Sequence, residues 1–106
     1  MQKWKICINN PFQNCDRVYP IQQERVKRLL DSILMTPGVS RVIVFGSSTT
    51  SRCRMESDVD IYVEGGCQKP KPVIYDFPYD LWTDMDVDER LYNEIVETGV
   101  VIYGNE

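Results

Sequence analysis

Apolar positions recur along the chain at two spacings, one typical of helices and one typical of strands. Residues 20–35 follow the helical spacing, and Pro20 suits the first turn of a helix. A second helical pattern begins at Asp86, an expected N-cap with Glu89 three positions later, and Gly99 marks its end. The chain is therefore expected to form two main helices.

Short apolar runs outside these helices contain the β-branched and aromatic residues that strands favour. The expected strands cover residues 3–8 (an edge strand), 41–45, 59–64, 79–83 and 100–103. The polar residues 48–55 are expected to form one or two helical turns. This order predicts an α/β fold, more narrowly an α+β fold, in which a small mixed β-sheet carries its helices mainly on one face.

Length and charge restrict the classes to which the protein belongs. At 106 residues the chain is expected to be one domain, residues 1–106. It has no apolar stretch long enough for a transmembrane helix and no apolar signal-peptide core, so a cytoplasmic protein is expected. The net charge of −4 argues against direct nucleic-acid binding. No CxxC spacing or histidine supports a zinc or redox site at the cysteines Cys7, Cys15, Cys53 and Cys67.

Two acids stand one residue apart at the strand expected over 59–64. Asp58 and Asp60 flank Val59, and because side chains alternate along a strand, both carboxylates point to the same side. Like charges this close repel each other unless a cation lies between them. Carboxylate oxygens are the ligands that Mg²⁺ prefers. The pair is therefore a candidate metal site.

A Gly-Ser turn precedes this acidic pair. Gly46 and Ser47 follow the apolar run 41–45, and ten residues separate them from Asp58. If the turn opens a helix, its free backbone N–H groups can bind a phosphate, which glycine allows to approach closely. The chain has no GxxxxGKS motif, so this turn is not a P-loop. Basic side chains that are candidates to neutralise the outer phosphate oxygens are Arg52, Arg54, Lys69 and Lys71.

A third carboxylate is expected from the next strand. Asp80 lies among aromatic and apolar residues in the run 79–83, where an unpartnered carboxylate is costly to bury. If that strand lies beside 59–64, Asp80 completes a cluster of three carboxylates that suits two metal ions. The competing candidates are Asp76, Asp84 and Asp86, of which the last two are better explained as loop and helix-cap residues.

The segment GSSTTSRCRMESDVDIYV, residues 46–63, resembles the signature of the polymerase-beta-like nucleotidyltransferase superfamily, and more closely its minimal nucleotidyltransferase branch. That branch has Gly-Ser, a ten-residue spacer and Asp-x-Asp, commonly with a serine before the first Asp, as Ser57 is here. The resemblance extends from the first helix to the terminal GVVIYG. It implies a mixed sheet with flanking helices, two Mg²⁺ ions, and transfer of a nucleoside monophosphate from a nucleoside triphosphate.

The resemblance also implies a role for each residue of the motif. Gly46 and Ser47 match the phosphate-binding turn. Asp58 and Asp60 match the metal ligands. Asp80 matches the third carboxylate, which is a metal ligand and the usual base for the acceptor hydroxyl.

The chain departs from this pattern just after the Gly-Ser turn. Many members carry Ala-Arg-Gly there, whereas this chain has Thr49-Thr50-Ser51. Either Arg52 or Arg54 would then take the place of the missing arginine in space. Without such a replacement, triphosphate binding would be weakened.

By this resemblance the chain is expected to be a metal-dependent nucleotidyltransferase that adds AMP from ATP to a hydroxyl acceptor. A chain this short leaves no room for a large acceptor domain, so the acceptor is expected on a partner protein. Proteins that this one resembles often pair with a HEPN-type toxin and act as antitoxins by adding AMP to a toxin tyrosine. The alternative is a degenerate binding module that neutralises a partner by contact. An edge strand at 3–8 also favours a homodimer.

Overall fold

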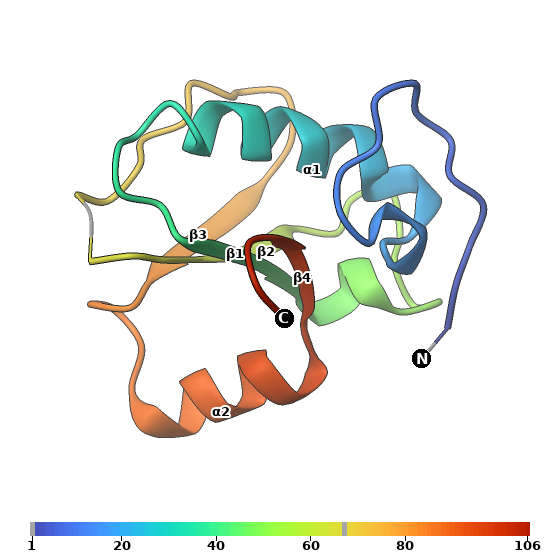
Figure 1. Ribbon diagram of the computed structural model, residues 1–106. Coiled ribbons are helices and arrows are strands. Elements are labelled where there is room, and N and C mark those ends of the chain that lie inside the picture. Colours follow the sequence, from blue (N-terminus) through green and yellow to red (C-terminus); the bar gives the residue numbers. More distant parts are fainter. Residues whose placement is uncertain (1, 67) are drawn as a thin grey trace.

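The computed structural model describes residues 2–66 and 68–106, which build a four-stranded sheet with a helix on each face (Figure 1). The elements in chain order are η1 (Cys15–Arg17), α1 (Pro20–Ile33), β1 (Arg41–Phe45), η2 (Gly46–Thr49), β2 (Val59–Glu64), β3 (Tyr79–Thr83), α2 (Glu89–Thr98) and β4 (Val100–Tyr103). The strand order is β3-β2-β1-β4. β1 pairs antiparallel with β2 and β4, whereas β2 and β3 run parallel. The predicted α+β class and mixed sheet are confirmed.

The two helices cover opposite faces of the sheet, so the prediction that they pack mainly on one face is wrong. Leu29 and Ile33 of α1 pack against Val42 on one face. Ile95 of α2 packs against Ile43 on the other face. The apolar run of β1 has no exposed position among residues 42–44, which is the pattern of a strand that is covered on both sides.

The N-terminal residues 3–8 do not form the predicted edge strand. Their backbone groups bind the side chain of Gln23 on α1 instead of a neighbouring strand. The Cys7 N–H donates to Gln23 Oε1 at 2.7 Å, and Gln23 Nε2 donates to the Lys5 carbonyl at 2.9 Å. The homodimer was expected from this strand, so it stays a prediction without that basis.

The second helix begins two residues later than predicted. Asp88 is its N-cap, and Asp88 Oδ1 accepts a hydrogen bond from the Leu91 N–H at 2.8 Å. Asp86 instead closes the turn after β3, because its carboxylate accepts from the Thr83 N–H at 3.1 Å. The turns expected over 48–55 are also different: the 3₁₀-helix η2 ends at Thr49, and no regular helix follows before β2.

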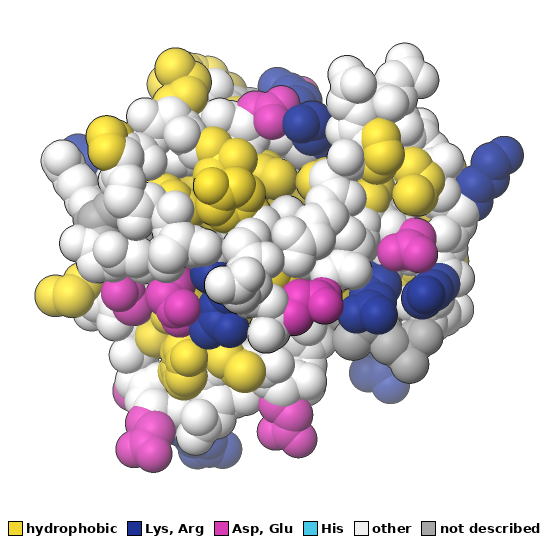
Figure 2. Space-filling model, in the orientation of Figure 1, with side chains coloured by type: hydrophobic (Ala, Val, Ile, Leu, Met, Phe, Trp, Pro, Cys, Tyr) yellow, Lys and Arg dark blue, Asp and Glu magenta, His cyan; other side chains and the backbone are white. Residues whose placement is uncertain are grey.

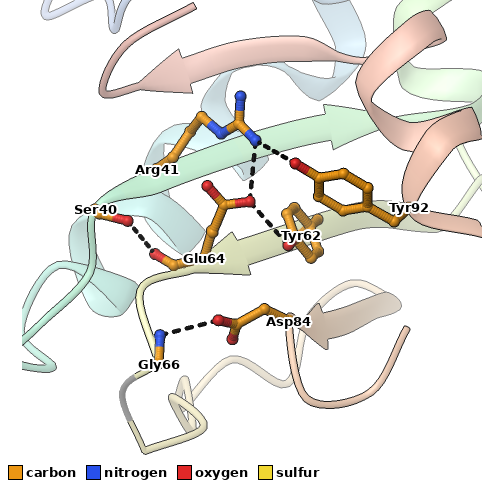
Figure 3. A network of polar contacts seen from close by, with 7 residues as sticks. All are labelled: Ser40, Arg41, Tyr62, Glu64, Gly66, Asp84 and Tyr92. Carbon is orange, nitrogen blue, oxygen red and sulfur yellow. Dashed lines mark hydrogen bonds and ion pairs between the residues drawn. The ribbon is translucent and has the colours of Figure 1, made fainter. Parts of the chain in front are cut away.

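A group of polar contacts joins β1, β2 and α2 at the Glu64 end of β2, which is the end remote from Asp60 (Figure 3). Arg41 Nη2 donates to Glu64 Oε2 at 2.9 Å and to the Tyr92 hydroxyl at 3.1 Å. The Tyr62 hydroxyl donates to the same carboxylate at 3.0 Å. Burial and this hydrogen bond raise the pKa of Tyr62, so it stays a neutral donor. These contacts join the end of β2 that is remote from Asp60 to β1 and α2.

The surface drawn in Figure 2 has acidic and basic side chains interspersed rather than gathered by sign. In the described part of the chain, no helix has the length and apolar character needed to cross a membrane. Cys7, Cys15 and Cys53 are free thiols, and Cys67 lies outside the described residues.

Candidate active site

The acids predicted as metal ligands gather at the start of the parallel pair of strands. Asp60 of β2 lies opposite Asp80 of β3 in the register. Two positions further, Tyr62 and Trp82 belong to the cluster under α2, so both acids stand on the face that α2 covers. Asp58 precedes β2, and its charge acts on Asp60 as that of Asp80 does. The fold therefore makes neighbours of three acids that the sequence only suggested together.

The surroundings of Asp60 shift the pKa of its carboxyl group. Burial raises the pKa of Asp60 to about 6, and the negative charges of Asp80 and then Asp58 act in the same direction. Asp60 is half-buried, whereas Asp58 and Asp80 are exposed. A bound cation would oppose each of these causes, because it replaces lost hydration and separates like charges.

The donor chemistry of the three acids fits Mg²⁺, a hard cation that takes carboxylate oxygens. Within residues 2–66 and 68–106, however, no group of three or more His, Cys, Asp or Glu side chains is arranged to hold a metal ion. Asp58, Asp60 and Asp80 are thus neighbours whose carboxylates do not converge on one point. Binding of an ion requires these side chains to turn toward it.

The three competing acids are each bound to a partner outside this group. The partners are the Arg28 guanidinium for Asp76, the Gly66 amide for Asp84, and the Lys69 ammonium with the Thr83 amide for Asp86. The hydrogen bond from Arg28 lowers the pKa of Asp76, and the hydrogen bond from Lys69 lowers that of Asp86. Asp80 is therefore the candidate that lies across from Asp60 in the sheet.

Gly46 lies directly against Asp60. β1 ends at Phe45, which is opposite Asp60 in the antiparallel register, and the chain turns at Gly46 with φ +76°. A Cβ atom at this position would lie 2.4 Å from Asp60 Oδ2. Glycine meets both requirements, because it has no Cβ and adopts positive φ without strain. The Gly-Ser turn and the acidic strand therefore form one unit.

The threonines that stand in place of Ala-Arg bind back onto this turn. Thr49 Oγ1 donates to the Gly46 carbonyl at 2.9 Å, and Thr50 Oγ1 donates to the Ser47 carbonyl at 3.1 Å. Thr50 Oγ1 also accepts from the Arg52 N–H at 3.2 Å. These hydrogen bonds hold the backbone of the turn in shape.

A hollow of about 690 Å³, the Gly46 hollow, opens beside the turn. The predicted residues that line it are Gly46, Ser47, Arg52 and Asp60. Six further residues line it that sequence reasoning did not place there: Gln2, Phe45, Thr49, Thr50, Glu94 and Thr98. Glu94 and Thr98 are exposed on α2, where the sequence shows only an ordinary polar helix face. The placement of α2 beside β1 brings them to the hollow.

Asp80 opens onto a second, smaller hollow of about 340 Å³, the Trp82 hollow, with Lys69 among its lining residues. Arg54 lines neither hollow. The Arg54 N–H donates to Ser57 Oγ at 2.9 Å, which places Arg54 in the loop before Asp58. Of the two arginines that were candidates to replace the missing one, Arg52 is the one beside the Gly-Ser turn.

A mixed sheet between two helices, with a Gly-Ser turn packed on paired strand acids, defines an α+β fold. Two solved structures share it. One is a crystal structure of a mutant of the toxin-antitoxin MntA-HpeT, 19% identical with a TM-score of 0.58, and the other is a toxin-antitoxin with AMP-PNP, 21% identical with a TM-score of 0.59. Each match covers 80% of this chain and 74% of the other. At these identities the likeness shows a shared fold.

The chain matches no protein-family model and no curated protein.

Proposed function

We propose that this protein is a metal-dependent nucleotidyltransferase that transfers AMP from ATP to a hydroxyl group on a partner protein. The observation that carries the proposal is the contact of Gly46 with Asp60, which is paired across the sheet with Asp80. In this proposal the Gly-Ser turn binds the phosphates beside the acids that hold the metal ions. Nucleotidyl transfer needs these two parts next to each other, because the metal ligands act on the bound phosphates.

The Gly46 hollow is the proposed nucleotide site. Ser47 and Arg52 line it, and their hydroxyl and guanidinium groups are donors suited to phosphate oxygens. Asp58, Asp60 and Asp80 are the three proposed carboxylate ligands of two Mg²⁺ ions. When bound, these ions would neutralise phosphate charge and lower the pKa of the attacking hydroxyl.

In the proposed reaction the acceptor hydroxyl gives its proton to the Asp80 carboxylate, which is exposed beside the Trp82 hollow. The acceptor oxygen then forms a bond to the α-phosphorus of ATP. The bond from that phosphorus to the bridging oxygen of the β-phosphate breaks, and pyrophosphate leaves with the electron pair. The products are the AMP ester of the acceptor and pyrophosphate.

The similar structures support a nucleotide and a protein partner. One of them was solved with AMP-PNP, an analogue of ATP, and both are described as toxin-antitoxin assemblies. The MntA-HpeT mutant carries two Asp-to-Glu changes with the same spacing as Asp58 and Asp60. We therefore propose that the acceptor is a hydroxyl of a toxin of the HEPN type, and that both proteins are cytoplasmic.

Two measurements test this function. Calorimetry should detect ATP binding that requires Mg²⁺, and ATP labelled at the α-phosphate should pass its label to the product of the neighbouring gene, which is the proposed partner. ATP labelled at the γ-phosphate should not, because the proposed reaction releases pyrophosphate. Absence of both Mg²⁺-dependent binding and label transfer would overturn the proposal.

A second candidate function is a binding module that neutralises its partner by contact. Two observations favour it: Thr49 and Thr50 stand in place of Ala-Arg, and the described acids are not arranged to hold an ion. The double variant Asp58→Asn, Asp60→Asn separates the two functions. If this variant still neutralises the toxin and melts at a higher temperature, contact explains the activity. If neutralisation is lost in a folded variant, transfer explains it.

A further inference from the structure

A fully buried amide connects α1 to the loop that carries Asp58. Gln22 has no exposed surface, and its Nε2 donates to the Ser57 carbonyl at 3.0 Å. The two residues are 35 positions apart in the chain. A buried amide is costly unless it is hydrogen-bonded, and an apolar residue would fill the same space without that cost. The position of this amide therefore has a use beyond packing.

Arg25 adds a second connection to the same loop. Its Nη1 donates to the Met55 carbonyl at 2.8 Å and lies 3.4 Å from Gln22 Oε1. One turn of α1 thus binds two backbone carbonyls of the loop, those of Met55 and Ser57. On the other side of Asp58, the Val59 N–H donates to the Pro78 carbonyl at 3.1 Å. The backbone is held on both sides of Asp58.

From these contacts we infer that Gln22 is a positioning residue for Asp58, and the inference rests on the proposed function. The carbonyl that Gln22 binds belongs to the peptide group that leads into Asp58. Fixing the orientation of that peptide plane fixes the backbone position from which the Asp58 side chain extends. Asp58 itself is exposed, so its own side chain has little packing to restrain it. The amide of Gln22 restrains, from the core, the backbone that carries this side chain.

Gln23 is a matched control on the same helix. It is the same residue type, is equally buried and uses its amide fully, but its partners belong to the N-terminal segment and not to the loop. Its amide contacts the Lys5 and Val18 carbonyls and the Cys7 N–H. Loss of either amide removes buried hydrogen bonds, but of the two glutamines only Gln22 binds the carbonyl of the residue before Asp58.

The test compares Gln22→Met with Gln23→Met, since methionine has nearly the same length but no donor. Mn²⁺ is the probe, and its binding is followed by electron paramagnetic resonance, with thermal melting measured on the same samples. Both variants should melt at a lower temperature. Gln22→Met should bind Mn²⁺ about tenfold more weakly, as expected for loss of a group that orients a metal ligand, and Gln23→Met should bind it like the wild type. Equal Mn²⁺ affinities for the two variants would overturn the inference.

A wild-type protein that binds no Mn²⁺ would instead overturn the proposed function, and the inference with it. Should Gln22→Met fail to fold, a surface pair replaces it. Arg25 and Arg28 both lie over the Phe77 ring, at 5.6 and 5.5 Å from its centre, but only Arg25 binds the loop, while Arg28 pairs with Asp76. Arg25→Met should weaken Mn²⁺ binding and Arg28→Met should not. The opposite order, or no difference, would count against the inference.

Discussion

Gly46 leaves no space between the turn after β1 and the carboxylate of Asp60. A Cβ atom there would lie 2.4 Å from Asp60 Oδ2, and the backbone of Gly46 has φ +76°. We expect Gly46→Ala to destabilise the protein by more than about 1 kcal/mol, because the backbone strain and the displacement of Asp60 add together. Urea denaturation measures the loss, and Mg²⁺-dependent ATP binding should disappear.

Gly66→Ala is the control for this variant. Gly66 has φ +63°, but nothing lies within 4 Å of a Cβ built there. It should therefore carry the backbone strain alone and keep ATP binding. If the two alanine variants lose equal stability and both bind ATP, the contact of Gly46 with Asp60 has no role in the site.

Asp60→Asn should stabilise the protein at neutral pH. The pKa of Asp60 is raised in the folded state from an ordinary value of 3.8 to about 6, by burial and by Asp80 and Asp58. The contribution of Asp60 to the free energy of unfolding is therefore fully present below its ordinary pKa of 3.8, where the carboxyl is protonated in both states. It is lost as the pH rises through about 6, where the folded protein must carry the charge. Asp60→Asn should therefore melt at a higher temperature than the wild type at pH 7.5, and the two proteins should melt at nearly the same temperature at pH 3.5. Added Mg²⁺ should reduce the difference at pH 7.5.

Asp76→Asn provides a contrast of opposite sign. The hydrogen bond from Arg28 lowers the pKa of Asp76 in the folded state, so its charge favours folding at neutral pH. The effect is expected to be small because both side chains are largely exposed. If, at pH 7.5, Asp76→Asn melts at a higher temperature than the wild type and Asp60→Asn at a lower one, this account of the two carboxylates is wrong.

Arg52→Gln should weaken ATP binding more than Arg54→Gln. Arg52 lines the Gly46 hollow together with Ser47, whereas Arg54 lies in the loop before Asp58. Loss of a charge-assisted hydrogen bond to a phosphate should weaken binding roughly tenfold. Calorimetric titration of both variants with Mg²⁺-ATP measures the difference. A larger loss in Arg54→Gln would make that residue the substitute for the missing family arginine.

The contacts around Arg41 predict a graded loss of stability. Tyr92→Phe removes one hydrogen bond to Arg41 and should cost about 1 kcal/mol. Arg41→Met leaves the half-buried Glu64 without its cation and should cost more, about 2 kcal/mol. Urea denaturation orders the two variants. Because these residues lie at the far end of β2 from Asp60, neither variant should change the affinity for Mn²⁺.

Local pattern predicted much of the sheet and one half of the site. The four strands from residue 41 onward have the predicted bounds, because each is a short apolar run that ends in turn residues. The spacing of Gly46, Ser47 and Asp60 predicted that they act together, and Arg52 was one of several basic candidates nearby; all four line one hollow. The strand predicted at 3–8 failed because Gln23 satisfies its backbone groups, which no local pattern reveals.

What the sequence determined by itself was local: where the strands lie, where the chain turns, and which acids stand one residue apart. Those features depend on neighbours within a few positions, so periodicity and spacing report them. Tertiary structure alone decided that Asp80 lies across from Asp60, that Glu94 reaches the Gly46 hollow, and that Gln22 binds the carbonyl before Asp58. Each of these depends on a contact between residues far apart in the chain, and a buried glutamine or an exposed helix position has the same local pattern whichever partner the fold brings to it.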